Sequence, residues 1–260
     1  MKIARMPYIN VDPFYYTLEY VEKKPNIELV VGYPREIGIF ARTKDGIDAA
    51  PISVMDFLNL KDIYEPMRMC VAVKKKAGSV NLFTKVPVKA LSGRRIGITS
   101  QTSTSKVLMK IILEQRYGVR SVVYLDQPEL RSVDAYLLIG NNALLHAHNG
   151  LKGFDYMYDL GEEWYKWTGL PFVFAVWAVK KSIPEADKDY LAAVLKQSME
   201  LFWKHEKEMA KRRSEELLIS PASIMDYWHL FIYNQTPGID KSLKLFERYA
   251  KTIKGVFANG

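Results

Sequence analysis

The sequence is poor in the residues that build metal, redox and nucleotide sites. Cys70 is the only cysteine, so no disulfide can form within the chain, and its apolar surroundings "MRMCVAV" predict a small residue buried in a strand. Two of the four histidines, His146 and His148, are two apart and would not share a helix face. With no cysteine pair, H-E-x-x-H, G-x-G-x-x-G or Walker loop, we expect no metal and no cofactor.

Long hydrophobic runs are also missing. The longest apolar stretch, "TGLPFVFAVWAV", is shorter than the roughly 18 residues of a membrane span. The start, "MKIARMPYIN", lacks the apolar segment of roughly 7–15 residues found in a signal peptide. We therefore expect a cytoplasmic, soluble protein without a membrane partner. An export signal upstream of Met1 would instead favour a solute-binding protein.

Acidic residues are fewer than basic ones, and this imbalance narrows the choice of partner. The net charge is +8 and the hydrophobic fraction of 48% is that of an ordinary globular chain. Such a charge favours nucleic acid, an acidic membrane surface or a small polycarboxylate. The basic runs "VKKKAGSV" and "AKRRSEE" lack interleaved aromatics and are typical of solvated turns or helix ends. We expect a small anionic ligand and no nucleic acid.

One local pattern, a short apolar strand followed by a polar turn and a helix, occurs four times. It is found in "KIARMPYIN" with "DPFYYTLEYVEK", "GIDAAPIS" with "VMDFLNL", "RRIGITSQTSTS" with "KVLMKIILEQ", and "VDAYLLIG" with "NNALLHA". Strands that alternate with helices predict an α/β fold with mostly parallel sheets. Ligands of such sheets bind beyond the carboxyl ends of the strands, where helix N-termini offer free N–H groups.

The third copy of this pattern is unusually rich in hydroxyl groups. Residues 99–105, "TSQTSTS", contain six of them between a strand and a helix. Ser103 or Thr104 could serve only as the helix cap, but a cap needs a single hydroxyl. We therefore predict that this segment binds a carboxylate or a phosphate.

Turn signals divide the chain into two lobes. Residues 1–85 plus 178–260 are expected to form lobe 1, and residues 86–177 to form lobe 2. The chain would then cross twice between the lobes, and the cleft between two lobes is a favoured ligand site. The last third of the chain has apolar residues at spacings of three and four, which predicts amphipathic helices.

Several motifs in order resemble a known family. From about residue 3 to residue 181 the chain is similar to the chorismate dehydratases of the futalosine route to menaquinone, in the motifs "RMPYINVDPFYY", "GIDAAPIS", "SVNLFTKVPVKALSGRRIGITSQTSTSKVLMKIILEQRYG", "DAYLLIGNNAL" and "YDLGEEWYKWTGLPFVFAVWAVKK". This resemblance implies a two-lobed fold like that of type II periplasmic binding proteins, in a cytoplasmic enzyme with an interlobe cleft.

The resemblance also implies a reaction. It is that of a carbon–oxygen hydro-lyase, which removes water from chorismate to give 3-[(1-carboxyvinyl)oxy]benzoate, the first step of futalosine-dependent menaquinone biosynthesis. Chorismate is a dianion, which fits the positive charge of the chain. A proton leaves C3, the C4 hydroxyl is expelled, and no redox cofactor is needed. No side chain stands out as a general base, so the enolpyruvyl carboxylate or a held water would accept the proton.

Two catalytic residues of the first lobe follow from the resemblance. Asn10, in "PYIN", would hydrogen-bond the substrate near its reacting carbons; the less favoured alternative is an Asx-turn ahead of Asp12 and Pro13. Asp12 is expected to cap the first helix. Ser53, in "APIS", would bind a carboxylate, or would simply cap the following helix; both roles are compatible if its N–H binds the ligand.

The remaining predicted substrate contacts lie in the second lobe. The residues are Ser103, Thr104, Ser105, Gly140, Asn141, Thr168 and Gly169. The three hydroxyls would bind the other carboxylate, and the turn at Thr168 and Gly169 could be purely conformational. Asn141 stands where the family is expected to have aspartate, so an acid or base role at that position is in doubt here.

Two other functions stay open at this point. One is a noncatalytic solute-binding protein for a small carboxylate, which Asn141 favours. The other is a different futalosine-pathway enzyme of similar fold that acts on a larger aromatic substrate. The "PYIN" and "TSTS" motifs argue against the latter, as does Gly140, because that relative is expected to have histidine there.

Overall fold

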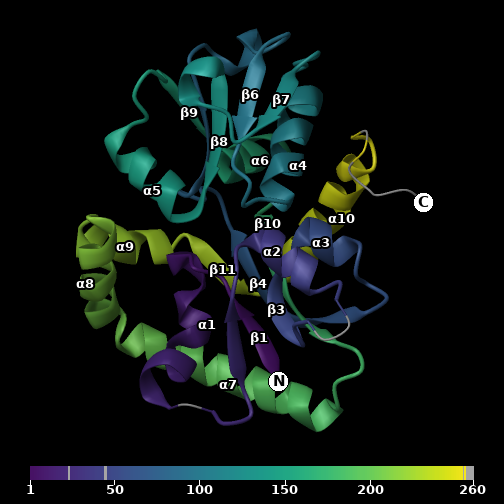
Figure 1. Ribbon diagram of the computed structural model, residues 1–260, viewed down its shortest axis with the longest axis vertical. Coiled ribbons are helices and arrows are strands. Elements are labelled where there is room, and N and C mark those ends of the chain that lie inside the picture. The colour runs from purple at the N-terminus through teal and green to yellow at the C-terminus, as the bar shows by residue number, and fades with distance from the viewer. Residues whose placement is uncertain (23, 44–45, 254, 256–260) are drawn as a thin grey trace. The chain divides into compact units, whose positions relative to one another are not determined.

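The computed structural model describes residues 1–22, 24–43, 46–253 and 255, which form two compact units (Figure 1). Unit 1 is Met1–Val71 with Ala175–Asn234, and unit 2 is Ala72–Phe174 with Gln235–Gly260. This division differs from the lobes expected above, because the chain passes between the units three times and its last helix, α10 (Pro237–Ala250), belongs to unit 2. There the hydroxyl of Ser242 accepts a hydrogen bond of 3.1 Å from the Trp164 indole.

Unit 1 is built on a six-stranded sheet. Its order is β11-β4-β10-β3-β1-β2, made of β1 (Lys2–Arg5), β2 (Glu28–Val31), β3 (Ala49–Ser53), β4 (Tyr64–Val73), β10 (Phe172–Lys180) and β11 (Phe231–Asn234). Strand β1 runs parallel to both β2 and β3, whereas β10 is antiparallel to β3. The sheet is therefore only partly parallel.

Short helices follow the parallel strands of unit 1, and longer ones follow later in the chain. They are the 3-10 turn η1 (Ile9–Val11), α1 (Asp12–Tyr16), the π-helical turn η2 (Thr17–Val21), α2 (Pro34–Phe40), α3 (Val54–Leu58), α7 (Glu185–Lys204), α8 (Glu206–Leu217) and α9 (Pro221–Trp228). Helix α1 packs on α7, and the Thr17 N–H donates to the Ser198 hydroxyl at 2.9 Å. Phe14 of α1 also meets the ring of Trp177 edge-on, with centroids 5.4 Å apart.

Unit 2 contains a five-stranded sheet of order β7-β6-β8-β5-β9. The strands are β5 (Val80–Thr84), β6 (Arg95–Ile98), β7 (Val123–Asp126), β8 (Ala135–Ile139) and β9 (Tyr156–Asp159). Strand β6 is parallel to β7 and β8, and β5 is antiparallel to β8 and β9. Besides α10, the helical elements of unit 2 are η3 (Val88–Ala90), α4 (Thr104–Ile111), the π-helical η4 (Ile112–Arg116), η5 (Leu130–Ser132), α5 (Gly140–Asn149) and α6 (Leu160–Thr168).

The α/β character and the four strand–turn–helix repeats predicted from the sequence are confirmed. They are β1 with α1, β3 with α3, β6 with α4, and β8 with α5. Cys70 is fully buried in β4, as its apolar surroundings predicted. None of the helices in the described ranges is both long and apolar enough to cross a membrane.

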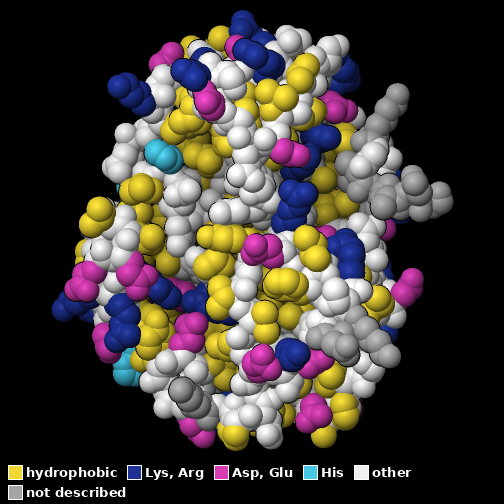
Figure 2. All heavy atoms as spheres, in the orientation of Figure 1, with side chains coloured by type: hydrophobic (Ala, Val, Ile, Leu, Met, Phe, Trp, Pro, Cys, Tyr) yellow, Lys and Arg dark blue, Asp and Glu magenta, His cyan; other side chains and the backbone are white. Residues whose placement is uncertain are grey.

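The basic residues are largely at the surface. Figure 2 shows Lys and Arg side chains interspersed with Asp and Glu over the viewed face. Lys74, Lys75 and Lys76 are all exposed in the segment that follows β4. This agrees with the interpretation of "VKKK" as a solvated turn.

Candidate functional site

In unit 1 the fold brings two predicted site residues to one edge of the sheet. Strands β1 and β3 are parallel neighbours, and their carboxyl ends therefore lie at the same edge. Asn10 lies in the segment that leaves β1, and Ser53 is the last residue of β3. Both are thus placed where ligands of α/β sheets bind.

Asn10 has an unusual environment. Its backbone carbonyl accepts a hydrogen bond of 3.0 Å from the Tyr233 hydroxyl, and the neighbouring carbonyl of Ile9 accepts one of 2.7 Å from the Trp228 indole. The side-chain oxygen Oδ1 of Asn10 is buried and has no hydrogen-bond partner among the described residues. Burying an unpaired acceptor costs about 1–3 kcal/mol, so such an atom calls for a functional explanation.

Asp12, two residues further on, is a buried ion-pair partner and not a helix cap. The N-cap of α1 is Val11, which makes no side-chain capping bond, so the prediction that Asp12 caps this helix is wrong. Its Oδ1 instead lies 2.6 Å from Arg5 Nη2, and its Oδ2 lies 2.8 Å from Arg213 Nε. Burial raises the pKa of Asp12 and the two guanidinium groups act against that rise. The two arginines therefore balance the negative charge of the carboxylate, and no unbalanced negative charge lies beside Asn10.

Ser53 acts as the N-cap of α3. Its hydroxyl donates to Asp56 Oδ2 at 2.6 Å and accepts from the Asp56 N–H at 3.4 Å. Arg42 Nη2 binds the other oxygen of Asp56 at 2.9 Å. The Ser53 hydroxyl is already engaged in this arrangement. The role of Ser53 as a carboxylate ligand stays a prediction, and the group that would bind the carboxylate is its backbone N–H.

In unit 2, strands β6 and β8 are also parallel neighbours, and the hydroxyl-rich segment and Gly140 follow their carboxyl ends. Gly140 has a φ of +65°, which favours glycine, and its N–H donates to the Ser79 carbonyl at 2.8 Å. Asn141 follows in the first turn of α5 and is partly exposed. The fold therefore gathers five predicted contacts at this edge: Ser103, Thr104, Ser105, Gly140 and Asn141.

The hydroxyl that caps α4 belongs to neither Ser103 nor Thr104, the two capping residues considered from the sequence. Thr102 accepts the hydrogen bond from the Ser105 N–H at 3.2 Å, whereas Ser103 occupies the N-cap position without a side-chain capping bond. Thr102 is buried and Ser103 is partly exposed. The hydroxyl of Ser103 is thus not used by the helix, which agrees with the argument that one cap does not account for six hydroxyls.

This assignment leads to a stability test. We expect Thr102→Ala to lower the free energy of unfolding by about 1 kcal/mol, the usual cost of removing a capping hydroxyl. Ser103→Ala should change it by less than about 0.5 kcal/mol, as is typical of a partly exposed position. Urea unfolding of both variants checks this, and equal losses in the two would contradict the assignment of the cap to Thr102.

Thr168 and Gly169, the other two predicted contacts of unit 2, lie at the carboxyl end of α6. Thr168 Oγ1 donates to the Trp164 carbonyl at 2.9 Å, and Gly169, with a φ of +70°, ends α6 in the left-handed conformation. Helix α6 has nine residues, so about 12 Å of helix separates its first residue from its last. The helix begins directly after β9, and Thr168 and Gly169 lie at its far end.

The sequence analysis missed Asp159, the N-cap of α6. Its carboxylate accepts hydrogen bonds from the N–H groups of Ala77 at 3.0 Å, Gly78 at 2.6 Å and Glu162 at 3.0 Å. Burial raises the pKa of Asp159, and these donors oppose the rise. A signal was present, because in "DLGE" a capping residue is followed three positions later by glutamate.

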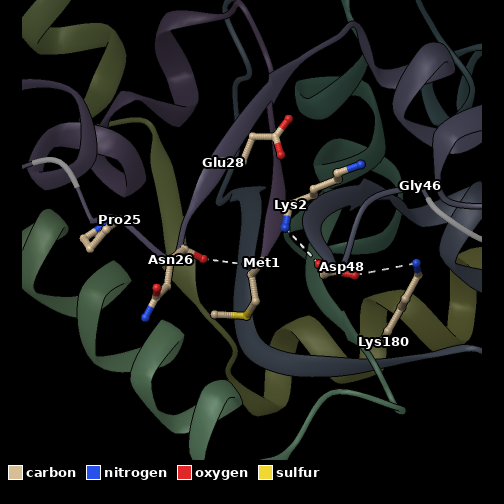
Figure 3. Close-up of a pocket in the computed structure, with 8 residues that line it drawn as sticks. All are labelled: Met1, Lys2, Pro25, Asn26, Glu28, Gly46, Asp48 and Lys180. Carbon is tan, nitrogen blue, oxygen red and sulfur yellow. Dashed lines mark hydrogen bonds and ion pairs between the residues drawn. The ribbon is translucent and has the colours of Figure 1, made fainter.

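A separate pocket of about 530 Å³ lies in unit 1, lined by Met1, Lys2, Pro25, Asn26, Glu28, Gly46, Asp48 and Lys180 (Figure 3). Lys2 begins β1 and Glu28 begins β2, so this pocket is at the amino ends of the strands, away from Asn10. Asp48 accepts from the Lys2 N–H at 2.8 Å and lies 3.7 Å from Lys180 Nζ. In the described ranges, no group of three or more His, Cys, Asp or Glu side chains is placed to hold a metal ion.

Comparison with known proteins gives a family and a relative of named activity. The sequence model of a family described as menaquinone biosynthesis matches residues 1–252. A protein of Thermus thermophilus named chorismate dehydratase is 30% identical over 194 residues, which cover 68% of this chain and 69% of that protein.

Solved structures show the fold. A protein from Archaeoglobus fulgidus superposes with a TM-score of 0.79 at 19% identity, over 98% of each chain. The alkanesulfonate-binding protein SsuA from Xanthomonas axonopodis pv. citri, bound to MOPS, gives a TM-score of 0.68 at 13% identity, over 98% of this chain and 92% of that one. A Candida albicans protein described as having the periplasmic binding protein fold gives 0.61 at 15% identity, over 100% and 91%. The periplasmic-binding-protein-like fold implied by the sequence motifs is confirmed.

Proposed function

The chain belongs to the menaquinone biosynthesis family, and from this premise we propose that it is a chorismate dehydratase. It would act as a hydro-lyase that converts chorismate to 3-[(1-carboxyvinyl)oxy]benzoate in the cytoplasm, the first step of the futalosine route. The named activity of the 30% identical relative supports this proposal. The observation that carries it is the buried Oδ1 of Asn10, which has no hydrogen-bond partner in the described ranges and lies beside the carboxyl ends of β1 and β3.

The environment of Asn10 suits a substrate-assisted elimination. A hydroxyl of the substrate would donate to Oδ1 and satisfy the buried acceptor, which places the reacting carbons next to Asn10. Burial raises the pKa of Tyr8 and of Tyr233, so both phenols stay protonated and neither serves as the base. The proton from C3 would pass to the enolpyruvyl carboxylate or to a held water, and the electron pair of the C3–H bond would form the new ring double bond as the C4–O bond breaks. The departing hydroxide would take up that proton and leave as water.

The groups of unit 2 complete the proposal. Ser103, Thr104 and Ser105, with the helix start at Gly140 and Asn141, are proposed as ligands of the second carboxylate of chorismate. Their hydroxyls and backbone N–H groups suit a carboxylate because charge-assisted hydrogen bonds to an anion are the strong ones. Thr168 and Gly169 keep the weaker assignment, since both take part in ending α6.

One observation favours a second candidate function. Asn141 stands where the family is expected to have an acidic residue, and an amide cannot accept or give up a proton as a carboxyl can. A chain of this fold that keeps its carboxylate ligands but lacks the chemistry would be a noncatalytic binding protein for small carboxylates.

The deciding experiment is incubation of the purified protein with chorismate, with the product followed by liquid chromatography and mass spectrometry and with binding measured by titration calorimetry. We expect the dehydrated benzoate to appear faster than in a protein-free control. Binding without product would favour the carboxylate-binding protein. Neither binding nor product would contradict both proposals.

A further inference from the structure

Several backbone carbonyls of the segment from Met6 to Asn10 accept hydrogen bonds from side chains. The Arg5 guanidinium donates to the carbonyl of Met6 and, at 3.4 Å, to that of Tyr8. Two side chains from distant parts of unit 1 donate hydrogen bonds to the carbonyls of Ile9 and Asn10. Four carbonyls in this segment therefore accept hydrogen bonds from side chains, and none of these four bonds involves the Asn10 amide group.

The two distant donors are Trp228, at the end of α9, and Tyr233, in β11. The Tyr233 bond ends on Asn10 itself, whereas the Trp228 bond ends on the residue before it. Tyr233 is only 7% exposed, and Phe14 meets its ring edge-on at 5.3 Å. Its ring is thus fixed by packing, and its hydroxyl has one defined role, as a donor to the Asn10 carbonyl.

We propose that Tyr233 is a positioning residue, which acts on the reaction through the backbone of Asn10. This inference rests on the proposed function. Oδ1 of Asn10 has no hydrogen-bond partner among the described residues, so no side-chain hydrogen bond fixes that oxygen before substrate binds. Its orientation then depends on the backbone that carries it, and Tyr233 is the side chain that donates to the carbonyl of Asn10 itself.

The chain offers a matched control in Tyr64. This residue is also a buried tyrosine of unit 1 whose hydroxyl donates to a backbone carbonyl, that of Ile47, at 2.6 Å. Ile47 precedes β3 and therefore lies at the amino edge of the sheet, away from Asn10. Tyr→Phe at either position removes one oxygen and leaves the ring in place.

The test compares Tyr233→Phe with Tyr64→Phe. We expect Tyr233→Phe to lower kcat for chorismate by about tenfold with KM changed less than about twofold, because a small misplacement of a reacting group is costly. Both substitutions should lower the midpoint of urea unfolding, and by similar amounts. Tyr64→Phe, however, should leave kcat within about twofold of the wild type. Equal kcat values in the two variants would overturn the proposal.

A second measurement is independent of catalysis. Amide hydrogen exchange of a peptide covering residues 6–14, followed by mass spectrometry, should be faster in Tyr233→Phe than in the wild type and unchanged in Tyr64→Phe. If the wild type does not turn over chorismate, the proposed function fails, and this exchange comparison still decides whether Tyr233 holds the segment. Unchanged exchange in Tyr233→Phe would overturn the positioning role.

Discussion

Asn10→Ala is expected to lower kcat for chorismate dehydration by about 10²-fold or more without destabilising the protein. The substitution removes the acceptor that we place at the reacting carbons, and misplacement or loss of such a contact costs about this much. It also removes a buried oxygen for which the described part of the chain offers no hydrogen-bond partner. An unpaired buried acceptor costs about 1–3 kcal/mol, so its loss leaves the free energy of unfolding unchanged or increases it.

Thr17→Val is the control for this prediction. Thr17 Oγ1 is also buried without a hydrogen-bond partner within the residues that the structure describes, and it lies in η2 of the same unit. Its replacement by the isosteric valine should give the same neutral or stabilising effect and leave turnover within about twofold. Steady-state kinetics and urea unfolding of both variants make the comparison. Full activity in Asn10→Ala would show that the unpartnered oxygen does not contact the substrate.

The parts of the fold that depend on local sequence were predicted correctly. The alternation of apolar strands with polar turns is a local property, and β1, β3, β6 and β8 are each followed by the helix expected from it. The family resemblance, carried by motifs in order, is confirmed by the match over residues 1–252. The antiparallel pairing of β10 with β3 was not foreseen, because strand direction is set by distant pairing and leaves no local pattern.

Details of the candidate site were harder to predict, for one local and one long-range reason. The sequence placed Asn10 and Ser53 after strands that the fold makes parallel neighbours. It could not show that the Ser53 hydroxyl is held by Asp56 or that Thr102 caps α4 in place of Ser103, because one turn of backbone geometry decides such caps. The donors that hold the Asn10 segment, Trp228 and Tyr233, are more than 200 positions away in the chain.

The second large effect concerns the ion pairs of Asp12. Its carboxylate is 2% exposed and contacts two guanidinium groups, Arg5 at 2.6 Å and Arg213 at 2.8 Å. Asp12→Ala would leave both arginines without this partner in a largely buried setting. Breaking a buried pair by removing one member typically costs about 3–5 kcal/mol, and we expect a loss of that size in the free energy of unfolding.

The same argument predicts a partial rescue. In Arg213→Met with Asp12→Asn, one buried charge of each sign is removed together, and neutral groups of similar volume replace them, so we expect the double variant to be more stable than Asp12→Ala. Arg131→Ala, which breaks an exposed pair with Glu129, should change stability by less than about 0.5 kcal/mol. Urea unfolding of these three variants decides the matter. A loss in Asp12→Ala no larger than in Arg131→Ala would mean that the desolvation cost of the carboxylate cancels its attraction to the two arginines.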